Sequence, residues 1–285
     1  MIITNPLDTV RIRWQVSQKA YTEKSVRSFA ARVIAEEGLV TGLWLPAIGT
    51  NAAFCSIAVG IRLGLYPTIR DTICASIDSK SPGVMFASGL VSGACAYFCG
   101  SPLYMMKNRL QSEAGLKSAD GIYLTGVRNG KAPSYRNGAH GLVSIAKSEG
   151  ILGLWRGSGV LVARGATLNS SQLTGYDGTK RFCKANGLLE DGTALHVTAS
   201  VVGALFLTTC VMPLDVLLTR YQTAQNVAGK DFAGPLSCAA QLFRDEGPRV
   251  FFRGWGPMFC RMLPSSLVTF LLYENIRSAA GIEFS

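Results

Sequence analysis

The motif PLDTVRIRWQ (residues 6–15) returns as PLYMMKNRLQ (102–111) and as PLDVLLTRYQ (213–222). Each copy starts with Pro-Leu and ends with an arginine and a glutamine that are two positions apart. The copies lie 96 and 111 residues apart, by the difference of their proline numbers. This period is too long for a solenoid repeat and suits two long helices with a connecting segment. The motif therefore predicts three helix hairpins, in repeats of residues 1–78, 79–188 and 189–285.

Uncharged stretches precede the second and third copies, at residues 81–106 and 193–214. Each offers the roughly 20 uncharged residues that a bilayer-spanning helix needs. Residues 43–61 form another uncharged run, and residues 157–176 and 258–273 form weaker runs that each contain a single arginine. Two spans per repeat predict six membrane helices.

The composition alone does not reveal a membrane protein, since 48% hydrophobic residues and a mean hydropathy of +0.25 also fit a soluble domain. Helices that surround a polar interior explain the low average, because their inward faces are polar. Only five residues precede Pro6, so the first helix is predicted to be truncated at the N-terminus. Residues 1–10 lack a basic start followed by an apolar run, which predicts no cleavable signal peptide.

The positions two and five residues after each proline hold Asp8 and Arg11, Tyr104 and Lys107, and Asp215 and Leu218. With them, the motif resembles the Pro-x-[Asp/Glu]-x-x-[Lys/Arg]-x-[Lys/Arg]-x-Gln signature of the mitochondrial carrier family, in three copies that cover nearly the whole chain. The resemblance implies an all-α protein of the mitochondrial inner membrane, with three pseudo-threefold-related helix hairpins around a central cavity. It also implies a short surface helix in each repeat and both termini on the cytosolic side.

The family's second signature resembles Glu149-Gly150 followed by Trp155-Arg156-Gly157, and Glu246-Gly247 followed by Phe252-Arg253-Gly254. In the first repeat, Glu37-Gly38 leads to Trp44 with one extra residue, and Leu45-Pro46 replaces the pair of a basic residue and glycine. We call the turn from the signature glutamate to the start of the next span the corner of the repeat. The corner of the first repeat is therefore predicted to be reshaped. The kept signatures open helices whose amino termini can bind the phosphates of a lipid such as cardiolipin. The lipid-binding residues expected there are Arg156, Gly157, Arg253 and Gly254.

Charged groups within a bilayer span are costly unless they are paired or hydrated, so acids and bases at one depth should meet across the interior. In the family, the acid of each odd-numbered helix pairs with the base of the next odd-numbered helix. The resemblance therefore implies that Asp8 pairs with Lys107 and that Asp215 pairs with Arg11. Tyr104 and Leu218 would form the third contact of this matrix gate. The motif's glutamines, two helical turns further on, are expected to add hydrogen bonds, and they are Gln15, Gln111 and Gln222.

The third signature, an aromatic residue and an acid followed by a base, resembles Tyr176-Asp177 with Lys180 and Tyr273-Glu274 with Arg277. In the first repeat Arg70 is kept, but Pro67 stands where the acid belongs. The cyclic rule then implies a cytoplasmic gate in which Asp177 pairs with Arg277. It also pairs Glu274 with Arg70 and leaves Pro67 opposite Lys180.

The prolines of the motif, Pro6, Pro102 and Pro213, are predicted to lie inside spans. There each proline removes a backbone hydrogen bond and kinks its helix. The kinks would draw the odd-numbered helices together and close one end of the cavity.

The even-numbered helices carry the residues that are expected to bind substrate. Arg164 and Arg261 each lie twelve residues before the tyrosine of the third signature and so share one depth near mid-membrane. Arg62 lies closer to the cytosolic side. Three guanidinium groups suit an anion with two charges, since each can bind carboxylate or sulfate through two hydrogen bonds. The alternative is that each arginine extends toward a lipid headgroup.

These arginines also match the family's contact positions. Arg62 and Gln172 resemble residues of the oxoglutarate, dicarboxylate and uncoupling branches of the family. Residues 101–105, with an uncharged residue at 218, are most similar to carriers of oxaloacetate, sulfate and related dianions.

Other features exclude several classes of protein. The net charge of +10 fits anionic lipid better than nucleic acid, because no aromatic-lined groove accompanies the bases. The eight cysteines are spread singly, without zinc spacing or a disulfide framework. His140 and His196 are far from any cluster that could hold a metal. No nucleophile with a base and no glycine-rich phosphate loop is present, so we expect neither an enzyme nor a cofactor, and we expect a monomer.

Three functions remain open from the sequence. The favoured one is an alternating-access carrier of small dianions, either oxaloacetate and other dicarboxylates or sulfate. The second is an uncoupling protein that conducts protons or fatty-acid anions, and the third is a membrane protein derived from a carrier that transports nothing.

Overall fold

The computed structural model describes residues 4–17, 25–77, 82–187, 193–225 and 232–264. These residues are helical apart from turns and a loop before α5 that contains an isolated β-bridge. The long helices are α3 (Ile48–Ile77), α4 (Pro82–Ser112), α6 (Ser158–Ala185) and α7 (Thr193–Thr223). The short α-helices are α1 (Asn5–Val16), α2 (Val26–Glu37), α5 (Gly138–Ser148) and α8 (Pro235–Glu246). A further helix occupies residues 255–264.

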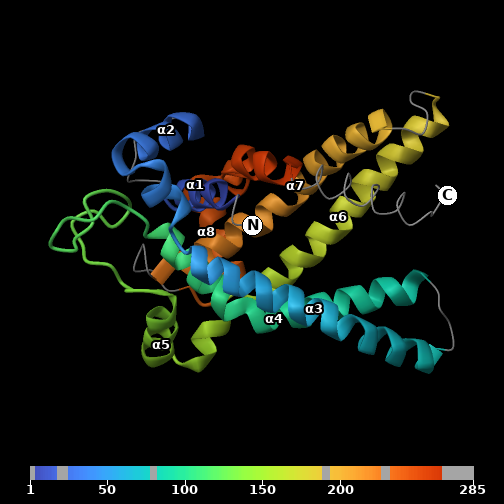
Figure 1. Cartoon of the computed structure of the whole chain (residues 1–285), viewed down its shortest axis with the longest axis horizontal. Helices are drawn as coiled ribbons and strands as arrows, with labels where there is room; N and C mark the ends of the chain where they lie inside the picture. The colour runs from blue at the N-terminus through green and yellow to red at the C-terminus, as the bar shows by residue number, and fades with distance from the viewer. Residues whose placement is uncertain (1–3, 18–24, 78–81, 188–192, 226–231, 265–285) are drawn as a thin grey trace.

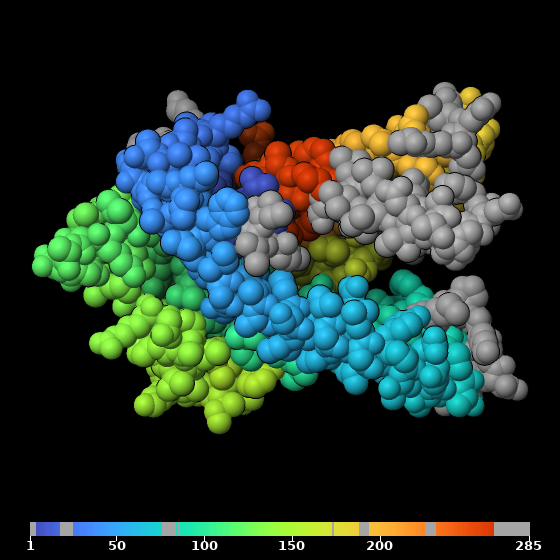
Figure 2. All heavy atoms as spheres, viewed as in Figure 1, coloured from blue at the N-terminus to red at the C-terminus, as the bar shows by residue number. Residues whose placement is uncertain are grey.

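The long helices pack in pairs that are consecutive in the sequence, α3 with α4 and α6 with α7. In Figure 1 these pairs form two arms toward one end of the molecule, and α1, α2, α5 and α8 gather at the other end. The space-filling view shows the α3 and α4 arm at the lower right and the α6 and α7 arm at the upper right (Figure 2). Each pair joins helices of different predicted repeats. The closest contacts between long helices therefore lie between repeats rather than within them.

Two helical segments of the described residues are long and apolar enough to cross a bilayer, Val40–Ala75 and Ala194–Thr223. They correspond to the predicted spans at 43–61 and 193–214. At about 1.5 Å per residue, α4 is also long enough, but its many glycines and serines make it less apolar. The long helices expose large apolar side chains, as suits contact with lipid, and examples are Ile57, Leu63, Phe98 and Phe206. The full set of six spans stays a prediction.

Two of the three motif prolines lie inside helices as predicted, Pro102 in α4 and Pro213 in α7. Proline at a helix interior leaves the carbonyl four residues earlier without its usual donor. For Pro102 that carbonyl belongs to Phe98, and it accepts a hydrogen bond of 3.0 Å from Trp155 Nε1. The prediction for Pro6 is wrong, because Pro6 lies in the first turn of α1. At that place a missing backbone N–H costs nothing, so no kink follows.

Each repeat contains the predicted short helix, α2, α5 or α8, and each of these helices ends one or two residues before the glycine of the second signature. The next turn is a 3₁₀ helix in the second and third repeats, η2 (Ile151–Trp155) and η4 (Pro248–Phe252). In the first repeat it is a π-helix, η1 (Val40–Trp44). A π turn holds more residues than a 3₁₀ turn, so it accommodates the extra residue before Trp44.

The loop between α4 and α5, for which the sequence suggests no role, docks on the first repeat. Thr125 Oγ1 donates a hydrogen bond of 2.6 Å to Glu37 Oε1 at the end of α2. Within the loop, Arg128 pairs with Glu113 at 3.1 Å. Burial and the nearby Glu113 carboxylate raise the pKa of Tyr123 to about 12. The loop is thus a fixed connection between the first and second repeats.

Candidate functional site

An ion pair ties each copy of the motif to the end of the short helix of its own repeat, and the pair of the first repeat is fully buried. In the first repeat, Arg13 donates to both carboxylate oxygens of Glu37, at 2.6 and 2.7 Å. The matching pairs are Arg109–Glu149 at 2.5 Å and Arg220–Glu246 at 3.4 Å. Sequence reasoning missed these pairs. The signal was present, since both members recur at matched positions in all three repeats.

The matrix-gate acids meet the bases that the cyclic rule assigns to them. Lys107 Nζ lies 3.1 Å from Asp8 Oδ2, and Arg11 Nη1 lies 2.9 Å from Asp215. All four residues are buried. At the third place, Tyr104 and Leu218 belong to one buried apolar cluster that also contains Phe54 and Leu161. This cluster adjoins the ion pairs, because Lys107 Nζ lies 5.6 Å from the centroid of the Tyr104 ring.

The motif glutamines have different partners. Gln15 Nε2 donates to Asp215 Oδ2 at 3.1 Å, so it supports an acid as expected. Gln222 accepts from Asn108 at 2.7 Å. Gln111 donates to Asn5 Oδ1 and to Thr9 Oγ1, each at 3.1 Å. Among the hydrogen bonds of the described residues, Gln15 is the one motif glutamine that binds a gate carboxylate.

A cavity of about 420 Å³ adjoins these ion pairs. All four residues that the sequence suggests for substrate binding line it, namely Arg62, Arg164, Arg261 and Gln172. Arg164 and Arg261 are buried, Gln172 is half-buried and Arg62 is exposed. The gate residues Asp8, Arg11 and Lys107 line the same cavity. The structure thus brings the predicted binding residues together with the predicted gate.

The two buried arginines also bind the gate acids. Arg164 Nε lies 2.7 Å from Asp215 Oδ1, and Arg261 Nε lies 3.2 Å from Asp8 Oδ1. The sequence analysis assigned these acids to the gate alone. A carboxylate has about four lone-pair sites, so one acid can serve two cations, and a buried guanidinium requires such a partner.

The charges of this buried cluster do not balance. Its cations are Arg11, Lys107, Arg164 and Arg261, and its carboxylates are Asp8 and Asp215. Among the described residues the cluster therefore carries two positive charges in excess. Such an excess in a partly closed cavity attracts anions.

The predicted cytoplasmic gate is only partly visible. Glu274 and Arg277 lie outside the described residues. Asp177 and Lys180 lie on α6, where both are half-buried. Arg70 pairs with its neighbour Asp71, with its Nη2 2.8 Å from Asp71 Oδ1. The sequence analysis missed this acid, which is adjacent in the chain.

The residues expected to bind lipid form two corners of similar design. Arg156 stacks on the Tyr221 ring and Arg253 stacks on the Trp14 ring, each with the guanidinium carbon 4.6 Å from the ring centroid. Burial lowers the pKa of Arg253, and the Glu246 charge opposes this effect. Sequence reasoning missed both aromatic partners. The described contacts place these guanidinium groups on aromatic faces and do not test lipid binding.

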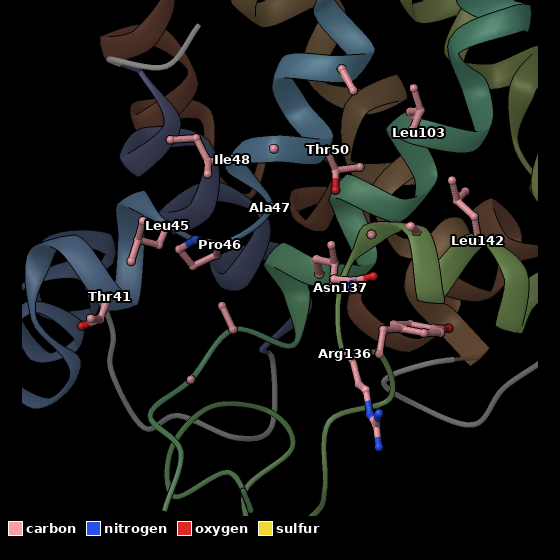
Figure 3. Close-up of a pocket in the computed structure, with 18 of the residues that line it drawn as sticks. Thr41, Leu45, Pro46, Ala47, Ile48, Thr50, Leu103, Arg136, Asn137 and Leu142 are labelled. Atoms are coloured by element: carbon pink, nitrogen blue, oxygen red, sulfur yellow. The ribbon is translucent and has the colours of Figure 1, made fainter.

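The first corner has a different design. The backbone shifts the match with the second signature by one residue, because Ala47, with a positive φ, takes the place of Gly157 and Gly254. Pro46, rather than Leu45, therefore stands in place of the arginine, and Leu110 stands in place of the aromatic residue. Both line a cavity of about 660 Å³ at this corner. Figure 3 shows Leu45 and Pro46 of the first repeat on one side of this cavity and Leu142 of the second repeat on the other. The first corner is thus apolar and open, whereas the other two are closed by stacked cations.

Long helices with exposed apolar side chains, packed around a cavity that buried ion pairs line, are typical of a membrane transporter. The model of the family "Mitochondrial carrier protein" matches residues 1–76, 78–187 and 190–282. The chain therefore belongs to the mitochondrial carrier family. Like other members, it is a transporter of the mitochondrial inner membrane and not an enzyme.

Three relatives show the range of the similarity. The mitochondrial oxaloacetate transport protein of Saccharomyces cerevisiae is 32% identical over 96% of this chain and 83% of that protein. The brown fat uncoupling protein 1 of Ovis aries is 30% identical over 97% of this chain and 86% of its own length. The mitochondrial 2-oxoglutarate/malate carrier protein of Mus musculus is 30% identical over 98% of this chain and 86% of its own length.

Proposed function

We propose that this carrier moves small dianions, such as oxaloacetate, other dicarboxylates or sulfate, by alternating access. The observation that carries the proposal is the charge of the cavity. Counted over the described residues, its buried cluster has two positive charges in excess, which is the complement of a dianion. Arg62 adds a further cation at a more exposed place, where water and salt screen it.

The binding step follows from the shared carboxylates. Arg164 and Arg261 exchange Asp215 and Asp8 for the anionic groups of the substrate, while Arg62 and Gln172 contact the rest of it. The same two acids hold Arg11 and Lys107, so their release weakens the matrix gate. Substrate binding then favours the state that is open to the matrix, since a ligand shifts an equilibrium by its differential affinity.

The remaining parts of the carrier are assigned by the same proposal. Three repeats of residues 1–78, 79–188 and 189–285 supply two membrane helices each, and the protein acts as a monomer. A cytoplasmic gate closes when the matrix gate opens, and its residues are Arg70, Asp177, Lys180, Glu274 and Arg277. A lipid such as cardiolipin binds at Arg156–Gly157 and at Arg253–Gly254.

Exchange by the purified protein in liposomes tests this function. Arg164→Ala and Arg261→Ala should each reduce exchange of labelled malonate or sulfate at least about a hundredfold, because a buried charged hydrogen bond to the substrate is lost. Lys147→Ala removes a cation from the exposed face of α5 and serves as the matched control. Full exchange by either cavity variant would contradict the assigned binding site.

A second function is favoured by the similarity to uncoupling proteins and by a side pocket next to the cavity. This pocket of about 390 Å³ shares Arg62 with the cavity and is otherwise largely apolar, with Leu63, Phe86 and Leu90. It suits an anion with an alkyl chain. A proton leak that fatty acids stimulate, without dianion exchange, would support this function and exclude the first.

A further inference from the structure

Tyr104 stands where the other two copies of the motif have an aspartate, and its ring is a neutral partner for cations. Tyr104 is 5% exposed, and Phe54 packs edge-on against it with ring centroids 5.1 Å apart. Lys107 Nζ lies 5.6 Å from the centroid of the Tyr104 ring, and the Arg164 guanidinium carbon lies 5.9 Å from it. An aromatic face attracts a cation but does not neutralise its charge.

Tyr104 also closes a ring of contacts below the cavity. From Tyr104 the ring passes through Lys107, Asp8, Arg11, Asp215 and Arg164 and returns to Tyr104. The ring contains three cations, two carboxylates and one neutral side chain. Arg261 contacts Asp8 from outside the ring. A carboxylate at position 104 would balance the charges of the ring.

We infer that Tyr104 determines the charge of the anion that the carrier accepts. With tyrosine, the buried cluster that the described residues form has two positive charges in excess and complements a dianion. With an acid at the same place, it would have one and would complement a monoanion. Tyr104 acts here as a specificity-determining residue that positions Lys107 and Arg164 without cancelling either charge. The inference rests on the proposed function, because it concerns the substrate of the same cavity.

The test compares malonate with malonamate, which have nearly the same shape and differ by one charge. Both compete with labelled malonate for exchange in liposomes that contain the full chain. Tyr104→Glu should lower the preference for malonate over malonamate about tenfold relative to Tyr104→Gln, which has the same shape without the charge. This size follows from one unit charge about 6 Å away at an effective dielectric constant between those of protein and water. Equal preferences in the two variants would overturn the inference.

A second variant keeps the test decisive if Tyr104→Glu does not fold. Leu218→Lys adds a cation to the apolar cluster that contains Tyr104 and raises the excess to three. It should shift the preference from glutarate toward tricarballylate, which has the same carbon chain and one more carboxylate. The double variant Tyr104→Glu with Leu218→Lys should restore the preference for malonate. An unchanged preference in Leu218→Lys would overturn the inference.

The control variant is Asn129→Asp, which adds one negative charge at an exposed loop position with almost no change of shape. It should keep the preference of the wild-type protein, and a tenfold change there would overturn the inference by showing that distant charge has the same effect. A wild-type protein that exchanges no dianion overturns the proposed function itself. A wild-type protein that exchanges malonate, with variants that do not shift the preference, overturns only the role of Tyr104.

Discussion

In each repeat, the corner after the short helix is held against the next repeat. The first corner uses other contacts for this than the second and third corners do. In the second and third repeats, an arginine stacks on an aromatic ring of the next repeat around the cavity, Arg156 on Tyr221 and Arg253 on Trp14. The backbone carbonyls of the same arginines accept hydrogen bonds from Gln222 and Gln15. In the first repeat neither the stacked cation nor this direct glutamine bond is found among the described contacts.

The first corner compensates with Asn5. Its side chain donates to the carbonyls of Trp44 and Pro46, at 2.6 and 3.1 Å, and accepts from Gln111 and Asn51, each at 3.1 Å. Asn5 thus connects the glutamine of the second repeat to the corner that it does not reach directly. We call this set of hydrogen bonds the Asn5 relay. It takes the place of the direct bond from a motif glutamine to the corner that the other two repeats have.

The difference teaches that partners are lost together. Pro46 and Leu110 belong to different repeats and replace both members of one stacked pair. Tyr104 and Leu218 do the same at the gate. A lone buried cation or acid would be costly, so each paired loss avoids it. Tyr104 and Leu110 both lie on α4, which therefore carries two of these four substituted positions.

The largest effect is expected for the ion pair beside the first corner. Glu37→Gln removes the carboxylate from Arg13, which is 1% exposed, and should lower the free energy of unfolding by about 3–5 kcal/mol. Glu246→Gln changes the matching pair of the third repeat, where the atoms are 3.4 Å apart and both side chains are partly exposed. There the loss should be only about 1 kcal/mol. Thermal unfolding in detergent measures the loss of stability in both variants. Equal losses would show that the two ion pairs stabilise their repeats to the same extent.

A smaller effect is expected for Asn5, whose relay exists only at the first corner. Asn5→Ala leaves the carbonyls of Trp44 and Pro46 and the Gln111 amide without this partner, at a cost of about 1–3 kcal/mol. Asn108→Ala removes a buried amide that bonds Gln222 at 2.7 Å and is the matched control. If only the relay supports the first corner, Asn5→Ala should also increase proteolysis within residues 40–47, whereas Asn108→Ala should not. Equal proteolysis in both variants would argue against the relay.

Much of this arrangement could be predicted from the sequence. The resemblance to the mitochondrial carrier family predicted the pairing of Asp8 with Lys107 and of Asp215 with Arg11, whereas the repeat spacing by itself only placed these acids and bases at one depth. The same spacing placed Arg164 and Arg261 at one depth. The extra residue before Trp44 predicted a reshaped corner.

Other contacts could not be predicted in this way. The contact of Arg164 with Asp215 depends on how far the even-numbered helices lean toward the axis, and spacing along one helix does not contain this information. The Asn5 relay depends on the exact path of the first corner. Pro6 was placed inside a helix by analogy with Pro102, but α1 starts there and gives the residue a different environment.

The glycines of the corners offer a third test. Gly254 has φ +94°, and a Cβ there would lie 3.2 Å from Arg11 Cγ. Gly254→Ala should therefore cost about 1–2 kcal/mol through backbone strain and crowding. Ala47 has a positive φ of 56° at the first corner, so Ala47→Gly should stabilise the protein by about 0.5–1 kcal/mol. Opposite shifts of the thermal midpoint are expected, and a loss in Ala47→Gly would mean that the methyl group has a packing role.

The smallest effect is expected from making the second corner resemble the first. Tyr221→Leu introduces the residue type of position 110 and removes the ring that lies 4.6 Å from the Arg156 guanidinium carbon. The cost should be about 0.5–1 kcal/mol, as for other partly exposed cation–π contacts. Tyr221→Phe keeps the ring and should be nearly neutral. Leu110→Phe supplies a ring to the first corner but should add no cation–π stability, because Pro46 offers no cation. A gain in Leu110→Phe equal to the loss in Tyr221→Leu would show that ring packing, and not the stacked cation, distinguishes the corners.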